Sequence, residues 1–314
     1  MTDIFEKRTL ALGSVTLTTA YFTTSESINL RYGYTRQDKA SRGTVLVLNG
    51  RSEFIEKYAE PIERLAHRGY DVYTLDWRGQ GLSERMLPNR LKGHVSSFQH
   101  YIEDMKQFVT EKVLPTAVSP VIFLGHSMGG HICLRCVHDF PDMADILVLT
   151  SPMVDIDTRP LPRRAVRFLI RFGRDDDYAF FNGDEAPEFR RFEGNKLTSD
   201  PRRFRDHVDA VRNNPDLGLG GVTNGWIRAA YRSIDILNSP GYGAGIRKPV
   251  LMASAERDRI VSNKAQKRIC AVMPGCRFLS VPGARHEILK ESDAVQSVFW
   301  NAFDAFLTLH GRPA

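Results

Sequence analysis

A serine between two glycines is the group in this sequence whose surroundings are most suited to chemistry. Residues 121–130 read VIFLGHSMGG, so Ser127 lies in a Gly125-x-Ser127-x-Gly129 pattern directly after an apolar run. A serine hydroxyl is a weak nucleophile and has to stand exposed beside a base. A sharp strand-to-helix turn exposes it, because flanking glycines permit the strained backbone and the helix N-terminus favours developing negative charge. The pattern therefore predicts a nucleophilic serine rather than an inert glycine-rich turn.

His286 is the candidate general base. It follows the apolar run of residues 277–281, beyond the end of an expected late strand. Open α/β sheets place their sites at the carboxyl ends of their strands. The other histidines fit other positions, on the serine turn itself, within helices or in the tail. We therefore expect His286 to accept the proton of Ser127.

Two carboxylates compete to orient this histidine. Glu256 and Asp258 both follow the apolar run of residues 249–253, which gives the chain order serine, acid, histidine. We favour Asp258, because the apolar pair at residues 260–261 would return the chain to the core and hold the loop over the sheet. Its predicted role is to fix the imidazole tautomer and stabilise the imidazolium without itself accepting the proton.

A tetrahedral intermediate needs two aimed N–H donors for its oxyanion. One is expected to be the backbone N–H of Met128, the residue after the nucleophile. The other should come from the loop after the apolar run of residues 44–48, where we nominate the N–H of Arg51. The predicted triad and these donors supply the chemistry by themselves, so we expect no cofactor.

Alternating strands and helices are expected to position these groups. Residues 14–24 and 28–35 alternate in β fashion and indicate an antiparallel hairpin. From residue 43 the alternation of strand and helix predicts a mostly parallel sheet with helices on both faces. We expect strands at residues 44–48, 70–75, 121–124, 146–150, 249–253 and 277–281, and helices at 56–67, 98–113, 127–138, 263–272 and 294–309.

The alternation stops between residues 155 and 238. This segment contains several amphipathic stretches but no clear buried strand. We therefore expect a helical lid at 155–238, inserted between a first part of the core, residues 1–154, and a second part, residues 239–314.

Motifs along most of the chain carry a family resemblance. They are NGRSEFIEKY at 49–58, DWRGQGLS at 76–83, GHV at 93–95, GHSMGG at 125–130, NKLTS at 195–199 and GGVTNGW at 220–226. Together they resemble the bacterial lysophospholipase L2 family, which is close to the monoglyceride lipases.

The resemblance implies an α/β-hydrolase fold with a helical cap. It also implies hydrolysis of the ester of a single-chain lipid, a lysophospholipid or a monoacylglycerol, with Ser127, Asp258 and His286 as the triad. One departure is Asn49-Gly50, where monoglyceride lipases have His-Gly, and it bears on the substrate more than on the reaction.

The motif at residues 76–83 is interpreted as structural. An aspartate and an arginine beside a glycine-rich turn more often tie loops together than perform chemistry.

A basic amphipathic stretch covers residues 161–174 of the expected lid. Its apolar side chains are surrounded by Arg163, Arg164, Arg167, Arg171 and Arg174. Such a helix can lie on an anionic membrane, or it can close over an acyl chain with its arginines in solvent. Our hypothesis is that both apply, and that arginines near the mouth, Arg163 and Arg167 among them, attract a phosphate-bearing head group.

The net charge of +6 is spread along the chain and favours an anionic surface or substrate, while nucleic-acid motifs are absent. Cys133 and Cys136 form a CxxC inside an expected helix, which we interpret as buried small residues. We expect neither a metal nor a disulfide.

The N-terminus lacks the apolar core of a signal peptide, and no stretch approaches the ~20 apolar residues of a spanning helix. We expect a soluble, cytoplasmic protein, with peripheral contact to the inner face of the membrane as an option. The oligomeric state is left open.

Rival functions share parts of this pattern. A carboxylesterase for small esters or an aminopeptidase would keep the mechanism and change the lid. An acyltransferase would share the acyl-enzyme. A non-catalytic lipid-binding α/β-hydrolase module is disfavoured because all triad members are present. A haloalkane dehalogenase would need a carboxylate in place of Ser127.

Overall fold

A single nine-stranded sheet forms the centre of the molecule in the computed structural model, which describes residues 7–159, 161, 163–179, 183–184 and 191–311. The strands are β1 (Arg8–Leu12), β2 (Val15–Thr23), β3 (Asn29–Thr35), β4 (Thr44–Leu48), β5 (Asp71–Leu75), β6 (Val121–His126), β7 (Ile146–Thr150), β8 (Val250–Ala255) and β9 (Cys276–Val281). Their order is β1-β2-β3-β5-β4-β6-β7-β8-β9. Strands β4 to β9 run parallel, and β1, β2 and β3 form an antiparallel edge that joins β5.

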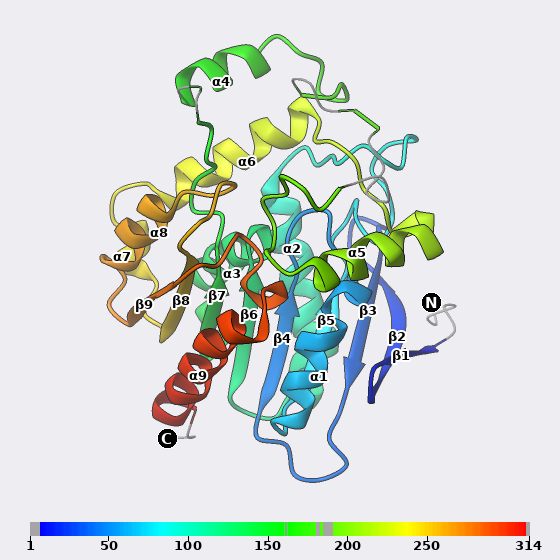
Figure 1. The fold of residues 1–314 in the computed structure, drawn as a ribbon, viewed down its shortest axis with the longest axis vertical. Helices are drawn as coiled ribbons and strands as arrows, with labels where there is room; N and C mark the ends of the chain where they lie inside the picture. The colour runs from blue at the N-terminus through cyan, green and yellow to red at the C-terminus, as the bar shows by residue number, and fades with distance from the viewer. Residues whose placement is uncertain (1–6, 160, 162, 180–182, 185–190, 312–314) are drawn as a thin grey trace.

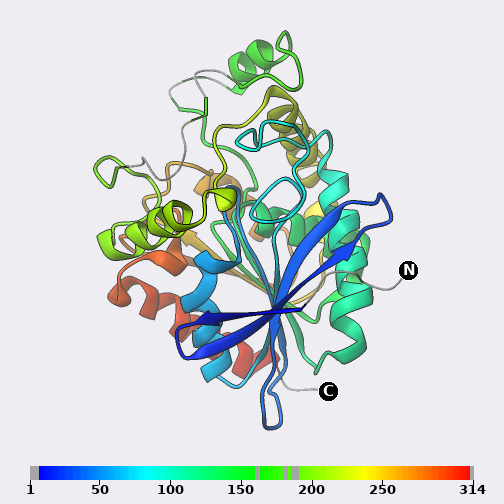
Figure 2. The ribbon, with the colours of Figure 1, turned by 90° about the vertical axis from the view of Figure 1, so that its right-hand side faces the viewer.

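Helices cover both faces of this sheet. They are α1 (Ala59–His67), α2 (Phe98–Phe108), α3 (Met128–Asp139), α7 (Tyr242–Gly245), α8 (Asn263–Cys270) and α9 (Asp293–His310). Val45 and Val47 of β4 pack into one core with α1 and α9, whereas Leu46 and Leu48 pack into the other with α2, α3 and α8. This alternation is the period of two of a strand buried on both faces. Figure 2 shows α1 and α9 on one side of the sheet and α2 on the other.

Three further helices lie between β7 and β8: α4 (Arg163–Ile170), α5 (Pro201–Asn213) and α6 (Asn224–Leu237). Figure 1 shows α6 above the carboxyl ends of the parallel strands, with α4 above α6. No strand occurs in the described residues of this stretch, as the sequence predicted. Nor is any helix in the described ranges long and apolar enough to cross a membrane.

Several element boundaries differ from those expected. Strands β4 and β7 lie as predicted, but β1 was not expected, because a five-residue edge strand gives little pattern. The helix expected at 98–113 is α2 followed by a π-helical turn, Val109–Val113. The helix expected from residue 56 starts with a 3₁₀ turn, Ile55–Tyr58.

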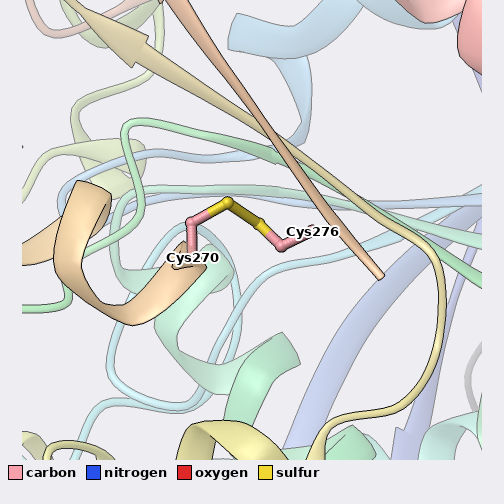
Figure 3. The surroundings of a disulfide bond; sticks show 2 residues. All are labelled: Cys270 and Cys276. Carbon is pink, nitrogen blue, oxygen red and sulfur yellow. A yellow bond between two sulfur atoms is a disulfide. The ribbon is translucent and has the colours of Figure 1, made fainter. Parts of the chain in front are cut away.

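The prediction that the chain contains no disulfide is wrong. Cys270 at the end of α8 and Cys276 at the start of β9 are bonded (Figure 3). The pair belongs to no CxxC pattern, but the tight turn between helix and strand brings the two Cα atoms within 5.3 Å, a separation that a disulfide can span.

Cys133 and Cys136 are free and fully buried on α3, in agreement with their interpretation as small core residues. In the described part of the chain, no group of three or more His, Cys, Asp or Glu residues is arranged to hold a metal ion.

A buried arginine fastens α5 to the core. Arg203 donates to both carboxylate oxygens of Glu60 on α1, to Asp293 at the start of α9 and to Asp200 at the N-cap of its own helix. Burial opposes ionisation of Glu60, but the hydrogen bonds from Arg203 and Arg64 outweigh it and lower the pKa of Glu60 to about 2. Opposite charges thus hold α5 against the helices of one face.

Replacing Arg203 by Gln is expected to lower the free energy of unfolding by about 2 kcal/mol at neutral pH, between the values for exposed and buried ion pairs. The contribution of the Glu60 ion pair to the free energy of unfolding is complete above the ordinary pKa of 4.5 and is lost as pH falls toward 2. Urea denaturation should therefore show the difference between wild type and Arg203→Gln shrinking below pH 4.5. A difference that does not change with pH would contradict this account. The exposed Arg212→Gln is the control.

Candidate active site

Ser127 occupies a strained turn between β6 and α3. Its φ of 50° and ψ of −113° lie in a region that residues other than glycine rarely adopt. The glycines on each side allow this geometry. A Cβ at Gly129 would lie 2.3 Å from the carbonyl oxygen of Leu48 on β4, and one at Gly125 would lie 2.8 Å from the Cα of Gly130. The sequence pattern therefore marks a close approach of helix to strand that only glycine fits.

The structure brings Ser127, His286 and Asp258 into one hydrogen-bonded chain. The Oγ of Ser127 lies 2.9 Å from Nε2 of His286, and Nδ1 of His286 lies 2.8 Å from Oδ2 of Asp258. The other oxygen of Asp258 accepts the backbone N–H groups of Ile260 and Val261. Asp258 follows β8 and His286 follows β9, so the three side chains meet at the carboxyl edge of the sheet.

The competing carboxylate lies elsewhere. Glu256 is exposed and accepts the N–H of Gly283 instead of contacting His286. Burial alone would raise the pKa of Asp258, but the charge of His286 and the N–H donors outweigh it, so that pKa lies below its ordinary value. An ionised Asp258 accepts a hydrogen bond from the Nδ1–H group of His286 and so leaves the Nε2 lone pair directed at Ser127.

Of the two nominated oxyanion donors, Arg51 lines the same cavity as Gly50 and Ser127, and Met128 is the first residue of α3, directly after the nucleophile. The side chain of Arg51 donates to the carbonyl of Gly220. The role of the two backbone N–H groups stays a prediction.

A buried charge network next to this space was missed by the sequence analysis. Lys57 donates to Glu53 at 2.7 Å and to Glu287 at 2.6 Å, and all three side chains are buried. Glu53 also accepts the N–H of Gly50 and the hydroxyl of Tyr58. The network therefore connects the loop that holds Arg51 to the residue after His286. The available signal was a glutamate and a lysine four residues apart, at the spacing of an ion pair on a helix.

Charge balance keeps this network ionised. Burial would raise the pKa of Glu53, but the charge of Lys57 and its hydrogen bonds hold that pKa below its usual range. His126 packs against the catalytic imidazole, with 4.9 Å between the centroids of the His126 and His286 rings. Burial lowers the pKa of His126, so the ring beside His286 is uncharged at neutral pH.

The loop at residues 76–83 has the structural role predicted for it. The carboxylate of Asp76 accepts the backbone N–H groups of Ile55 and Leu82 and the side chain of Arg31. Arg78 donates two hydrogen bonds to Asp104 on α2. These residues tie β3, α2 and the start of the first helical turn together without contacting Ser127.

Two cavities of similar size lie at this edge. The catalytic one, about 230 Å³, contains Ser127 and His286 and is lined by both charged and apolar side chains. The other, about 250 Å³, is apolar and lies under the cap helices, with Ile156, Leu161, Val166, Ile227 and Tyr231 in its wall. The N–H of Asp157 in the wall of the apolar cavity donates to the carbonyl of Ile260 in the wall of the catalytic one, so the two are neighbours.

Two of the cap arginines make ion pairs within the cap. Arg163 and Arg167 both donate to Asp235 on α6 and lie over the ring of Tyr231. They thereby fasten α4 to α6, and their attraction for a head group stays a hypothesis. The outer side of α4 exposes Phe168, and Phe172 beyond it is 73% exposed.

Replacing Lys57 by Met should leave Glu53 and Glu287 buried without their counter-charge. We expect the free energy of unfolding to fall by about 3 to 5 kcal/mol, since breaking one partner from a buried ion pair leaves an uncompensated charge. Chemical denaturation measures this loss, and the exposed Lys264→Met should leave stability unchanged. A variant as stable as wild type would show that the network contributes no net stability.

Comparisons with known proteins agree with this geometry. A family model described as serine aminopeptidase, S33, matches residues 39–293. The chain is 33% identical over 310 residues to lysophospholipase L2 of Escherichia coli strain K12, which covers 94% of this chain and 88% of the relative. It is 26% identical over 288 residues to monoglyceride lipase of Saccharomyces cerevisiae, and this match covers 86% of this chain and 85% of the relative.

A solved structure has the same fold. It is a soluble variant of the Saccharomyces cerevisiae monoglyceride lipase in complex with a substrate analogue, with a TM-score of 0.75, 20% identity and coverage of 97% of this chain and 98% of the other.

Proposed function

The chain belongs to the serine aminopeptidase S33 family of α/β-hydrolases, and we propose that it hydrolyses the carboxylic ester of a single-chain lipid, a lysophospholipid or a monoacylglycerol. The hydrogen-bonded series from Ser127 through His286 to Asp258 is the observation that carries the proposal. Similarity to lysophospholipase L2 and to monoglyceride lipase supports the lipid substrate. The apolar cavity beside the catalytic one offers room for part of an acyl chain.

Acylation follows from the atoms of the site. The Oγ of Ser127 attacks the ester carbon while Nε2 of His286 takes the hydroxyl proton. The carbonyl oxygen becomes an oxyanion, which accepts hydrogen bonds from the N–H groups of Met128 and Arg51. The intermediate collapses when the bond to the alcohol breaks, and His286 returns the proton to that leaving alcohol.

Deacylation repeats these steps with water. His286 removes a proton from the water that attacks the acyl-enzyme, and the fatty acid leaves as Ser127 recovers its proton. Asp258 stays ionised throughout and stabilises the imidazolium in both halves. The chain supplies every group that these steps use.

We further propose that residues 155–238 act as a lid over a core formed by residues 1–154 and 239–314. Helices α4 and α6 lie above the catalytic edge and supply part of the wall of the apolar cavity. The pairing of Arg163 and Arg167 with Asp235 joins α4 to α6.

The outer side of α4 suits contact with a membrane surface. Phe168, Leu169 and Phe172 are each more than half exposed, and Arg164 and Arg171 are exposed beside them. Aromatic and aliphatic side chains enter the interface of a bilayer, and neighbouring arginines favour anionic lipids. We propose that α4 rests on an anionic bilayer from which the substrate enters.

A cytoplasmic location stays a prediction. The Cys270–Cys276 bond weighs against it, because disulfides persist mainly in oxidising compartments.

Labelling by a fluorophosphonate probe tests the nucleophile. Wild type should be labelled, and Ser127→Ala should lose both the label and the release of fatty acid from lysophosphatidylcholine and monoacylglycerol. Asp258→Asn should retain binding and lose about 10⁴-fold in kcat, the effect of the wrong imidazole tautomer. Absence of labelling in folded wild type would contradict the hydrolase function and favour a lipid-binding role.

Flotation with liposomes tests the membrane surface. We expect Phe168→Ser/Phe172→Ser to bind anionic vesicles about 100-fold more weakly, because two buried phenyl rings at about 1.5 kcal/mol each contribute about 3 kcal/mol. Leu309→Ser, an exposed apolar residue at the far end of α9, is the control and should bind as wild type does. Equal binding by all three proteins would refute the contact through α4.

A further inference from the structure

A cationic basin adjoins the catalytic cavity. It is a cavity of about 520 Å³ whose wall contains the side chains Arg159, Lys196, Arg257, Arg259 and Arg285. Only two carboxylates, Glu256 and Asp258, share this wall. Five cations against two anions in one concave surface create a positive potential that attracts anionic groups.

The carboxylates of the basin are already engaged. Asp258 holds His286 and two backbone N–H groups, and Glu256 accepts the N–H of Gly283. Neither neutralises the neighbouring cations through an ion pair that the described residues contain. The positive charge of the basin is therefore left largely unbalanced.

Two of the five cations have structural partners. Arg285 donates to the carbonyls of Asn195 and Thr198, and Arg159 pairs with Asp157. In contrast, Lys196, Arg257 and Arg259 are exposed, and within the described ranges their side chains make no hydrogen bond or ion pair. These three form the part of the basin that is available to a ligand.

The basin and the catalytic cavity share a wall. Leu197 and Ile260 line the catalytic cavity, and each directly follows a basin cation, Lys196 and Arg259 respectively. The carbonyl of Lys196 also accepts the backbone N–H of His286. The available cations therefore lie on two separate loops that both contact the catalytic histidine or its cavity.

We propose that this basin binds the phosphate of a lysophospholipid whose ester is held at Ser127. The inference rests on the proposed function and adds the substrate class. Guanidinium and ammonium groups are the donors that bind phosphate oxygens, with arginine able to form two hydrogen bonds at once. In such a lipid only a short glycerol linker separates the ester from the phosphate. This agrees with a phosphate subsite whose cations, Lys196 and Arg259, are adjacent in sequence to residues that line the catalytic cavity.

The arrangement also explains why the cap arginines do not serve this purpose. Arg163 and Arg167 are both paired with Asp235, and Arg163 also with Asp155, while in the catalytic cavity Lys57 is paired with Glu53 and Glu287. Near the nucleophile, the basin offers cations that keep their charge for a ligand.

Kinetics with two matched lipids tests the proposal. Lauroyl lysophosphatidic acid and monolauroylglycerol share one acyl chain and differ in the phosphate, and both are used below their micelle concentrations at constant ionic strength. For Arg257→Gln/Arg259→Gln we expect KM for the lysophospholipid to rise about tenfold, or about 1.4 kcal/mol. Its kcat should be retained, and both constants for monolauroylglycerol should stay as in wild type.

Two further variants separate charge from structure. Lys196→Gln removes a basin cation from the other loop and should raise the same KM about threefold. Arg202→Gln/Arg205→Gln removes two exposed charges from α5, outside the basin. It should leave KM and kcat for both lipids as in wild type. If the control raised KM for the lysophospholipid as much as the basin variants do, overall charge would explain the effect and the proposal would fail.

The outcomes distinguish this proposal from the one it rests on. Wild type that hydrolyses neither lipid contradicts the proposed function. If wild type hydrolyses both lipids and the basin variants keep the wild-type KM for the lysophospholipid, the phosphate site alone is overturned. The same holds if the variants lose kcat equally for both lipids.

Inorganic phosphate should compete with the lysophospholipid in wild type and not in the double variant. Phosphate competition without any change of KM in the variants would assign the basin to free phosphate and also overturn the proposal.

Discussion

The backbone conformation of Ser127 is the constraint on which the catalytic edge depends. A positive φ at a residue with a side chain is unfavourable, and it persists only where the surroundings leave no alternative. Here α3 packs so close to β4 that the position of Gly129 has no room for a Cβ against the carbonyl of Leu48. The central parallel strands fix the positions of both α3 and β4, so the oxygen of Ser127 is held in one position. The loops after β8 and β9 place Asp258 and His286 next to that position.

Three loops at this edge are held by carboxylates that accept backbone N–H groups. Asp258 does so in the loop after β8, Asp76 in the loop after β5, and Glu53 in the loop after β4. For Asp258 and Glu53, the interactions with His286 and Lys57 and the hydrogen bonds outweigh burial and lower the pKa of the carboxyl group. For Asp76, burial outweighs the charge of Arg31 and the N–H donors, and it raises the pKa. In all three cases, the hydrogen bonds that satisfy the buried carboxylate also fix the loop.

The sequence predicted the parts that local patterns encode. The run TVLVL at β4 and the Gly-x-Ser-x-Gly pattern around Ser127 consist of residues adjacent in the chain, so they can be recognised in the sequence without knowledge of a distant partner. The Glu53–Lys57–Glu287 network was missed because its third member is 230 residues away from Lys57. The Cys270–Cys276 bond was missed for a different reason, since its geometry depends on how α8 turns into β9.

The distribution of positive charge shows a similar difference between sequence and structure. An arginine-rich cap segment suggests cations for a head group, yet pairing with Asp235 uses two of them to join α4 to α6. A cation that holds two helices together has already lost much of the charge that a ligand would meet. The cations that keep theirs are scattered in sequence, with Lys196 on one loop and Arg257 and Arg259 on another, and only the fold gathers them. Head-group recognition in this protein is therefore expected on the side of Asp258, where the charge is unbalanced, and not on the cap helix where the arginines are most numerous.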